Sequence, residues 1–328
     1  MNTVCFACKE KKELTIEHII PQALGGKLKE KLYCKDCNQN LGRTVDKELV
    51  IQFGKIATLL NIKRERGVSQ HFGVEEVKNG KKLVFDGKSV RREDPKVELK
   101  YEAGKKILKY ANIIARSEKE LKKIIYSVQK KSTINGEIKV FTEEHNGPID
   151  TKQEISIDNT LLRRAVTKIA YSFLCFKIPQ NILLSSAFDE ARSYMNYATG
   201  PDIACANFIN TKFMTDYNRP LHKIHIALNR NDELVIGYVS IFGIYRFAIM
   251  LSDKFSSNLE WPDFDYTYDP VIQREVFVND KFRAPPLNKG QILTPKQSRS
   301  FVQKELDRGL KVIESYVDNY QYLGGELS

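Results

Sequence analysis

Four of the six cysteines stand in two Cys-x-x-Cys pairs near the start of the chain. The pairs are Cys5/Cys8 and Cys34/Cys37, and 25 residues separate them. Four thiolates spaced in this way fill the tetrahedral positions of a zinc ion, and such closed sites are structural. The spacing therefore predicts a structural Zn²⁺ site, whose filled shell leaves no position for an activated water.

An acid–histidine dipeptide lies between the two cysteine pairs. Glu17 and His18 open the sequence Glu-His-Ile-Ile-Pro, and Asn38 follows the last cysteine directly. A neutral imidazole can take a proton from water near pH 7, and the oxygens of Glu17 and Asn38 are the ligand type that Mg²⁺ prefers. In a basic protein, an imidazole beside a hard cation predicts metal-assisted hydrolysis of phosphodiesters, with His18 deprotonating water.

These residues also carry a family resemblance. Glu17-His18-Ile-Ile-Pro21, Leu24-Gly25-Gly26 and Cys34-Lys-Asp-Cys37-Asn38 resemble the HNH endonucleases, the ββα-metal nucleases, over residues 3–47. The resemblance implies a ββα-metal module in which Glu17 is a ligand of catalytic Mg²⁺ or Mn²⁺, His18 is the general base and Asn38 completes the metal site. Gly42 and Asp46 are similar to one subgroup of the family and are interpreted as structural.

The chain departs from the family at one position. The middle Asn of the family, which orients the base, would fall near Lys29-Glu30-Lys31, where this chain has no Asn. A backbone carbonyl is the alternative group to orient His18.

The net charge of +11 is concentrated in the first half of the chain. Residues 1–150 contain 31 Lys/Arg against 21 Asp/Glu, whereas residues 151–328 contain 21 against 20. One-sided positive charge favours a polyanionic partner, because phosphate contacts release counterions. We expect DNA as the partner, and we expect the basic segment of residues 51–150 to contact its phosphates. The candidate contacts are Arg64, Arg66, Arg91, Arg92, Lys122 and Lys123. A solvated lysine face is the alternative for the helix that holds the last two.

Periodicity predicts the elements that follow the module. An amphipathic helix over 46–67, a hairpin turning at Asn79-Gly80, a strand over 97–101 and a helix capped by Ser117 make a mixed segment. An apolar helix over 159–176, a helix over 185–197, three strands between 224 and 251 and a helix over 295–320 follow. The sequence thus predicts an α+β protein, with an antiparallel meander and a long C-terminal helix after the ββα module.

The expected domain organisation has three parts. Residues 1–50 are the nuclease module, 51–150 a basic α/β region for DNA docking, and 151–328 an α+β domain for targeting, regulation or oligomerisation. The isolated thiols Cys175 and Cys205 are interpreted as buried, and His222 and His225, three apart on a strand, are not expected to share a metal.

The sequence contains no apolar run long enough to span a membrane and no signal peptide, which predicts a cytoplasmic protein with no membrane partner. By analogy with the family, phage defence or restriction is the expected setting. Two alternatives stay open: an inactive zinc module that binds nucleic acid, or a nuclease gated by a ligand sensed in the C-terminal domain, where Phe255–Tyr268 is rich in aromatic residues. A homodimer, a defence-system partner or an activating ligand are further hypotheses.

Overall fold

The fold was analysed in a computed structural model of the chain. It describes residues 4–64, 71–78, 80–92, 95–103, 105–115, 117–134, 151–152, 157–206, 219–255, 262–277, 287–293 and 299–322. The chain forms two compact units, residues 1–69 with 156–328 (unit 1) and residues 70–155 (unit 2). The predicted division into residues 1–50, 51–150 and 151–328 by function stays a prediction.

Unit 1 begins with a ββα motif. β1 (Leu14–His18) pairs antiparallel with β2 (Lys29–Cys34), with a bulge between Thr15 and Ile16. The connection contains the short 3₁₀ helix η1 (Gln22–Leu24). After β2 the chain forms α1 (Lys35–Leu41), one π-helical turn η2 (Gly42–Asp46) and α2 (Lys47–Leu59). The predicted ββα order is confirmed.

The helix predicted over 46–67 is shorter than expected. α2 ends at Leu59, because Leu60 is the C-cap and Asn61 then adopts a φ of 49°, in the left-handed region where a non-glycine residue interrupts a helix. Ile62 turns back into the core with 4% of its surface exposed. Burial of this apolar residue therefore sets the end of the helix.

The second part of unit 1 is a six-stranded antiparallel sheet in the order β10-β13-β12-β11-β14-β15. The predicted meander is confirmed as β11-β12-β13, in which every residue of the central strands β12 and β13 is buried. The strands are β10 (Ala204–Ala206), β11 (His222–Asn229), β12 (Leu234–Ile241), β13 (Tyr245–Ser252), β14 (Phe264–Asp269) and β15 (Arg274–Glu275).

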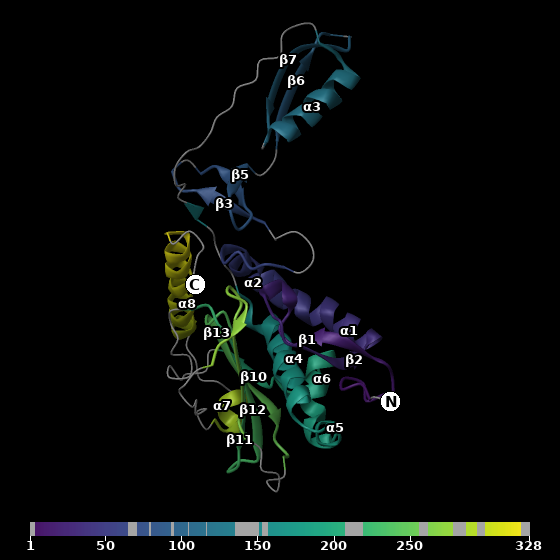
Figure 1. Ribbon diagram of the computed structural model, residues 1–328, viewed down its shortest axis with the longest axis vertical. Coiled ribbons are helices and arrows are strands. Elements are labelled where there is room, and N and C mark those ends of the chain that lie inside the picture. The colour runs from purple at the N-terminus through teal and green to yellow at the C-terminus, as the bar shows by residue number, and fades with distance from the viewer. Residues whose placement is uncertain are drawn as a thin grey trace. The chain divides into compact units, whose positions relative to one another are not determined.

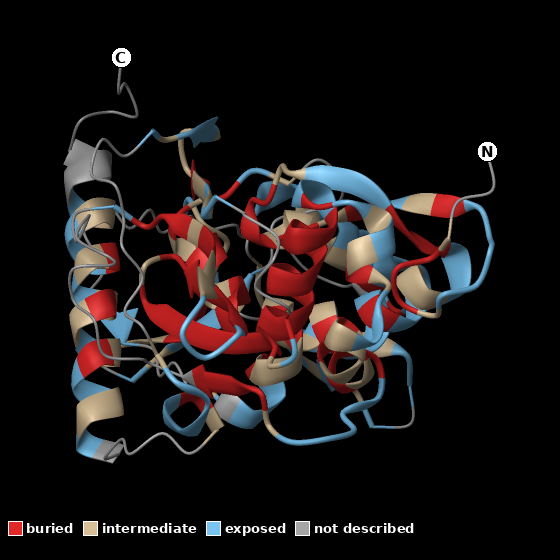
Figure 2. Cartoon of the chain, turned by 90° about the horizontal axis from the view of Figure 1, so that it is seen from below, coloured by how far each residue is buried: buried red, intermediate tan, exposed pale blue. Residues whose placement is uncertain are grey.

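Helix α4 (Asn159–Lys177) lies between this sheet and the ββα motif (Figure 1). Asp158 caps it by accepting from the N–H groups of Thr160 and Leu161. From Leu162 to Leu174 most of its side chains are fully buried, because α4 packs on both sides (Figure 2). Unit 1 therefore has three layers, with α4 in the middle.

Further helices surround these layers. α6 (Asp189–Tyr197) packs beside α4, and α8 (Arg299–Tyr322) is joined to β13 by a buried ion pair between Arg246 and Glu305. The remaining helices among the described residues of unit 1 are α5 (Gln180–Leu183), η3 (Ser186–Phe188) and α7 (Lys289–Leu293). The long C-terminal helix is confirmed.

The described residues of unit 2 form two small sheets and one helix. The first sheet has the order β5-β4-β3-β9 and the second β6-β7-β8. The predicted hairpin before and after Asn79-Gly80 is β3-β4, although Asn79 lies outside the described residues. The elements are β3 (Phe72–Glu76), β4 (Lys82–Phe85), β5 (Val90–Arg92), β6 (Lys96–Tyr101), β7 (Ile107–Ile114), α3 (Glu118–Lys131), β8 (Thr133–Ile134) and β9 (Thr151–Lys152).

The N-terminus of α3 follows the predicted capping pattern. The Ser117 hydroxyl accepts from the backbone N–H of Glu120 at 3.3 Å. The carboxylates of Glu118 and Glu120 lie in the first turn, and Lys130 and Lys131 in the last, which suits the helix dipole. The segment Ile138–Thr142 is also predicted from the sequence to be a strand, and it lies outside the described residues.

Candidate active site

The four clustered cysteines come together as the spacing predicts. The Sγ atoms of Cys5, Cys8, Cys34 and Cys37 all lie within 4.8 Å of one another. Zn–S bonds of about 2.3 Å in a tetrahedron put sulfur atoms about 3.8 Å apart, close to the 4.0 Å between Cys8 and Cys34. The donor set and its size therefore fit one metal ion.

Local structure explains this geometry. The first pair lies on a turn that the bridge between Val4 and Lys11 closes, and the second pair lies at the end of β2 and in the first turn of α1. The backbone N–H of Cys34 donates to Cys5 Sγ at 3.2 Å, and the pKa of the Cys5 thiol is lowered. Burial opposes this shift, but backbone N–H donors from Cys34 and Cys8 outweigh it. Such donors stabilise the thiolate that a zinc ion needs.

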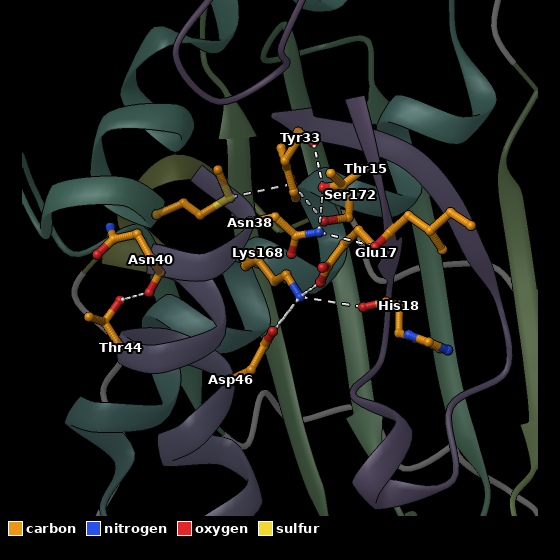
Figure 3. A network of polar contacts seen from close by, with 12 residues as sticks. Thr15, Glu17, His18, Tyr33, Asn38, Asn40, Thr44, Asp46, Lys168 and Ser172 are labelled. Carbon is orange, nitrogen blue, oxygen red and sulfur yellow. Dashed lines mark hydrogen bonds and ion pairs between the residues drawn. The ribbon is translucent and has the colours of Figure 1, made fainter. Parts of the chain in front are cut away.

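Glu17 and His18 stand next to each other at the end of β1 and leave the strand in opposite directions (Figure 3). The Glu17 side chain turns inward and is 6% exposed, whereas His18 is half-buried. Burial, reinforced by the nearby Asp46 carboxylate, raises the pKa of Glu17 above its ordinary value, although Lys168 acts in the opposite direction.

Asn38 in α1 lies against the same strand. Its Nδ2 donates to Thr15 Oγ1 at 2.8 Å and to the Ile16 carbonyl at 3.0 Å. A carbonyl only accepts, so the nitrogen of the amide must face β1, and these two bonds do not use the Oδ1 atom. The structure thus places Glu17 and His18 at the C-terminal end of β1, and Asn38 against Thr15 and Ile16 of the same strand. The oxygens of Glu17 and Asn38 fit a hard cation by their chemistry.

The position opposite His18 on β2 is Lys29. The family's middle Asn would fall in this part of β2, and the residue paired with His18 in this chain is a lysine. The group that orients the His18 ring stays a prediction.

Two further residues belong to this site and were not identified as functional from the sequence. Lys168, in the middle of α4, forms an ion pair with Glu17 and contacts Asp46, whose Oδ1 and Oδ2 both lie 2.9 Å from its Nζ (Figure 3). Asp46 closes the π-helical turn η2. A lysine in the middle of α4, among the apolar residues Val166, Ile169 and Ala170, was the available signal. Its partners lie more than 120 residues away in sequence.

The expected phosphate-contacting residues fall into different surroundings. Lys122 and Lys123 are exposed on α3, and Arg91 is exposed on β5. Arg64 is half-buried, and burial lowers its pKa. Arg66 and the side chain of Arg92 lie outside the described residues. Their contacts with DNA stay predictions.

The remaining candidate residues are buried in the core. Cys175 and Cys205 are buried, as expected. His222 Nε2 donates to the Leu24 carbonyl at 2.8 Å, and His225 Nδ1 lies 2.6 Å from Asp265 Oδ1. The two histidines therefore have separate partners and do not form one metal site.

Residues 4–54 match the HNH endonuclease family. Searches of curated proteins and of solved structures found no match for the chain. The family match and the four-cysteine cluster together show an HNH domain at the N-terminus, with a site that could hold a metal ion. Among the described residues, no helix is both long and apolar enough to cross a membrane.

Proposed function

We propose that this protein is a divalent-metal-dependent DNA endonuclease in which His18 is the general base. An HNH domain indicates a nuclease with nucleic acid as substrate and divalent metal as cofactor. The observation that carries the finer proposal is that Glu17, His18 and Asn38 all lie on or against β1, beside a cysteine cluster suited to structural Zn²⁺.

Each residue has a distinct task in this proposal. The imidazole of His18 takes a proton from the attacking water. The carboxylate of Glu17 and the Oδ1 of Asn38 hold Mg²⁺ or Mn²⁺, which when bound supplies Lewis-acid stabilisation to the scissile phosphate and the leaving oxygen. Asn38 Nδ2, bonded to the Ile16 carbonyl, keeps its amide oriented along β1.

DNA docking is proposed for the basic segment of unit 2. Residues 96–134 contain eleven Lys/Arg and four Asp/Glu, while the rest of unit 2 has more acidic than basic residues. Two of these acids, Glu98 and Glu118, pair with Lys96 and Lys122. The net charge of this segment favours a phosphate backbone.

The first test is plasmid cleavage by the purified protein with Mg²⁺, Mn²⁺ or EDTA, on plain and phage-derived DNA. We expect metal-dependent cleavage that falls by about 10³-fold in His18→Ala, because a general base contributes roughly 10²–10⁴-fold. The matched control is His71→Ala, since His71 is exposed on unit 2 and has no role in the proposal. Wild-type rates in His18→Ala would remove His18 as the base.

The same experiment, with DNA binding measured beside cleavage, separates the alternatives. DNA binding without cleavage on every substrate would favour a zinc module that only binds, and cleavage only after a signal would favour a gated nuclease. Direct packing of α4 from the C-terminal region on the HNH domain is the observation that favours gating. A cytoplasmic location, a role in phage defence or restriction, a homodimer and a defence-system partner stay predictions.

A further inference from the structure

The ammonium group of Lys168 is enclosed by oxygen atoms from the HNH domain. The side chain is 0% exposed, and its Nζ contacts Glu17 Oε1, both carboxylate oxygens of Asp46 and, at 3.4 Å, the backbone carbonyl of His18. These contacts join α4 to the end of β1 and to the turn before α2.

Burial of a lysine side chain has an unfavourable free energy. Removing an ammonium from water costs several kcal/mol unless carboxylates and further hydrogen bonds compensate it. Its neighbours Val166, Ile169 and Ala170 are fully buried and apolar, so an apolar side chain at this position would satisfy packing alone. The carboxylates of Glu17 and Asp46 lie against the ammonium and offset the cost of its burial. The charge is therefore retained for its contacts.

Those contacts bear on the strand that presents His18. β1 and β2 form a two-stranded sheet, which is marginally stable by itself. Asn38 holds one stretch of β1 through Thr15 and Ile16, and Lys168 holds the next two residues through the Glu17 carboxylate and the His18 carbonyl. With the backbone fixed on both sides, the point at which the imidazole leaves the strand is fixed as well (Figure 3).

We propose that Lys168 is a positioning residue of the nuclease site, which acts through Glu17 and the backbone of His18. This inference rests on the proposed function, in which His18 is the base and Glu17 a metal ligand. Lys168 itself touches no substrate, because it is buried. Through this contact the C-terminal part of the chain completes the HNH domain.

The test compares Lys168→Met, which keeps length and removes the charge, with Lys177→Met on the exposed end of the same helix. Steady-state cleavage is measured about 15 °C or more below the melting temperature of each variant, so that each variant is folded during the assay. We expect kcat of Lys168→Met to fall about 100-fold, the effect of a misplacement of about 1 Å, with KM for DNA changed by less than about twofold. The Lys177→Met control should retain wild-type kcat.

A readout independent of cleavage is amide hydrogen exchange. In Lys168→Met, peptides that cover β1 should exchange about tenfold faster or more, while peptides that cover β12 keep their wild-type rates. If Lys168→Met does not fold, Asp46→Asn takes the same measurements, because it loosens one anchor of the ammonium and leaves Glu17 in place. We expect about a tenfold loss of kcat there.

A folded variant with wild-type kcat would overturn the proposal. Exchange that is accelerated equally in β1 and β12 would also overturn it, because it would indicate general destabilisation. If the wild-type protein itself cleaves nothing, the proposed function fails, while exchange in β1 still decides whether Lys168 fixes this strand. The two failures are thus separate.

Discussion

The HNH domain and residues 96–134 of unit 2 are both small combinations of strands and helix, yet their interiors differ. In the HNH domain Cys5, Ile19, Leu24 and Leu41 are 0% exposed. Among the described residues of 96–134, the buried side chains are Leu108, Val128 and Ser132, and each retains some exposure. The HNH domain therefore has a dense core, whereas most side chains of residues 96–134 are exposed and many of them are charged.

The difference follows from what holds each segment in place. The HNH domain has the cysteine cluster and receives hydrogen bonds from distant residues, such as Tyr33 with Ser172 at 2.7 Å and Tyr171 with the Phe6 carbonyl at 3.0 Å. In residues 96–134 the ion pairs are exposed, and such pairs contribute about 0–1 kcal/mol. The proposed catalytic residues lie in the HNH domain, where packing fixes their atoms. The proposed docking residues lie in residues 96–134, where their charge matters more than their exact position.

The largest expected effect comes from removing the metal of the cysteine cluster. Cys34→Ser should abolish metal binding at the cluster and lower the free energy of unfolding by several kcal/mol, because binding of structural zinc contributes directly to folding. Metal content by atomic emission and the urea midpoint measure it. Cys205→Ser is the control, since Cys205 is buried outside the cluster and should leave the metal content intact.

A tight turn in the HNH domain gives the next effect. A Cβ at Gly26 would lie 2.0 Å from the Ile20 carbonyl oxygen, so Gly26→Ala forces the backbone to move. We expect a loss of about 2–4 kcal/mol, measured by urea unfolding. Gly42→Ala provides the contrast: Gly42 has helical φ and ψ and open space around its Cβ, so alanine should stabilise by about 0.5–1 kcal/mol. Equal effects at both positions would contradict the dense packing of the turn.

His222 makes the attachment of the HNH domain dependent on pH. Burial lowers its pKa from 6.5 to about 4, and its neutral ring donates to Leu24 and accepts from the Phe242 N–H. Because the unfolded state takes up the proton first, this contribution to stability is complete above pH 6.5 and is lost as the pH falls toward 4. The expected loss at pH 5 is about 2 kcal/mol.

Urea unfolding at pH 7 and pH 5 measures this effect. His222→Gln is the control, because its amide can donate to the same carbonyl and does not titrate. Subtracting its pH dependence removes the contribution of the cysteine thiols. The same pH dependence in both proteins would show that His222 is not the titrating group.

The smallest effect on stability is expected in unit 2. Reversing the charges of Lys122 and Lys123 should change the free energy of unfolding by less than about 1 kcal/mol, since both are exposed on α3. DNA affinity should fall, and the slope of log K against log salt should decrease by about 1 for each lost phosphate contact. A control with the same change of net charge is reversal of Lys177 and Lys254 in unit 1. Equal losses in both proteins would indicate an effect of net charge rather than contact.

Local sequence was sufficient for several elements. Ser117 caps α3 through its own side chain, and the β3-β4 hairpin pairs the segments that were predicted before and after Asn79-Gly80. These features depend on contacts a few residues apart, so propensity and periodicity predict them. The end of α2 was missed, because it depends on burial of Ile62 rather than on local preference.

The sequence by itself determined the cysteine cluster, the HNH domain with its Glu17, His18 and Asn38, and the positive charge of the first half. Tertiary structure alone decided that Glu17 turns inward to Lys168, that Asp46 joins it, and that α4 forms the middle layer of unit 1. The reason is that metal-ligand spacing and capping act between near neighbours. The partners of a buried charge are chosen by the packing of segments more than a hundred residues apart.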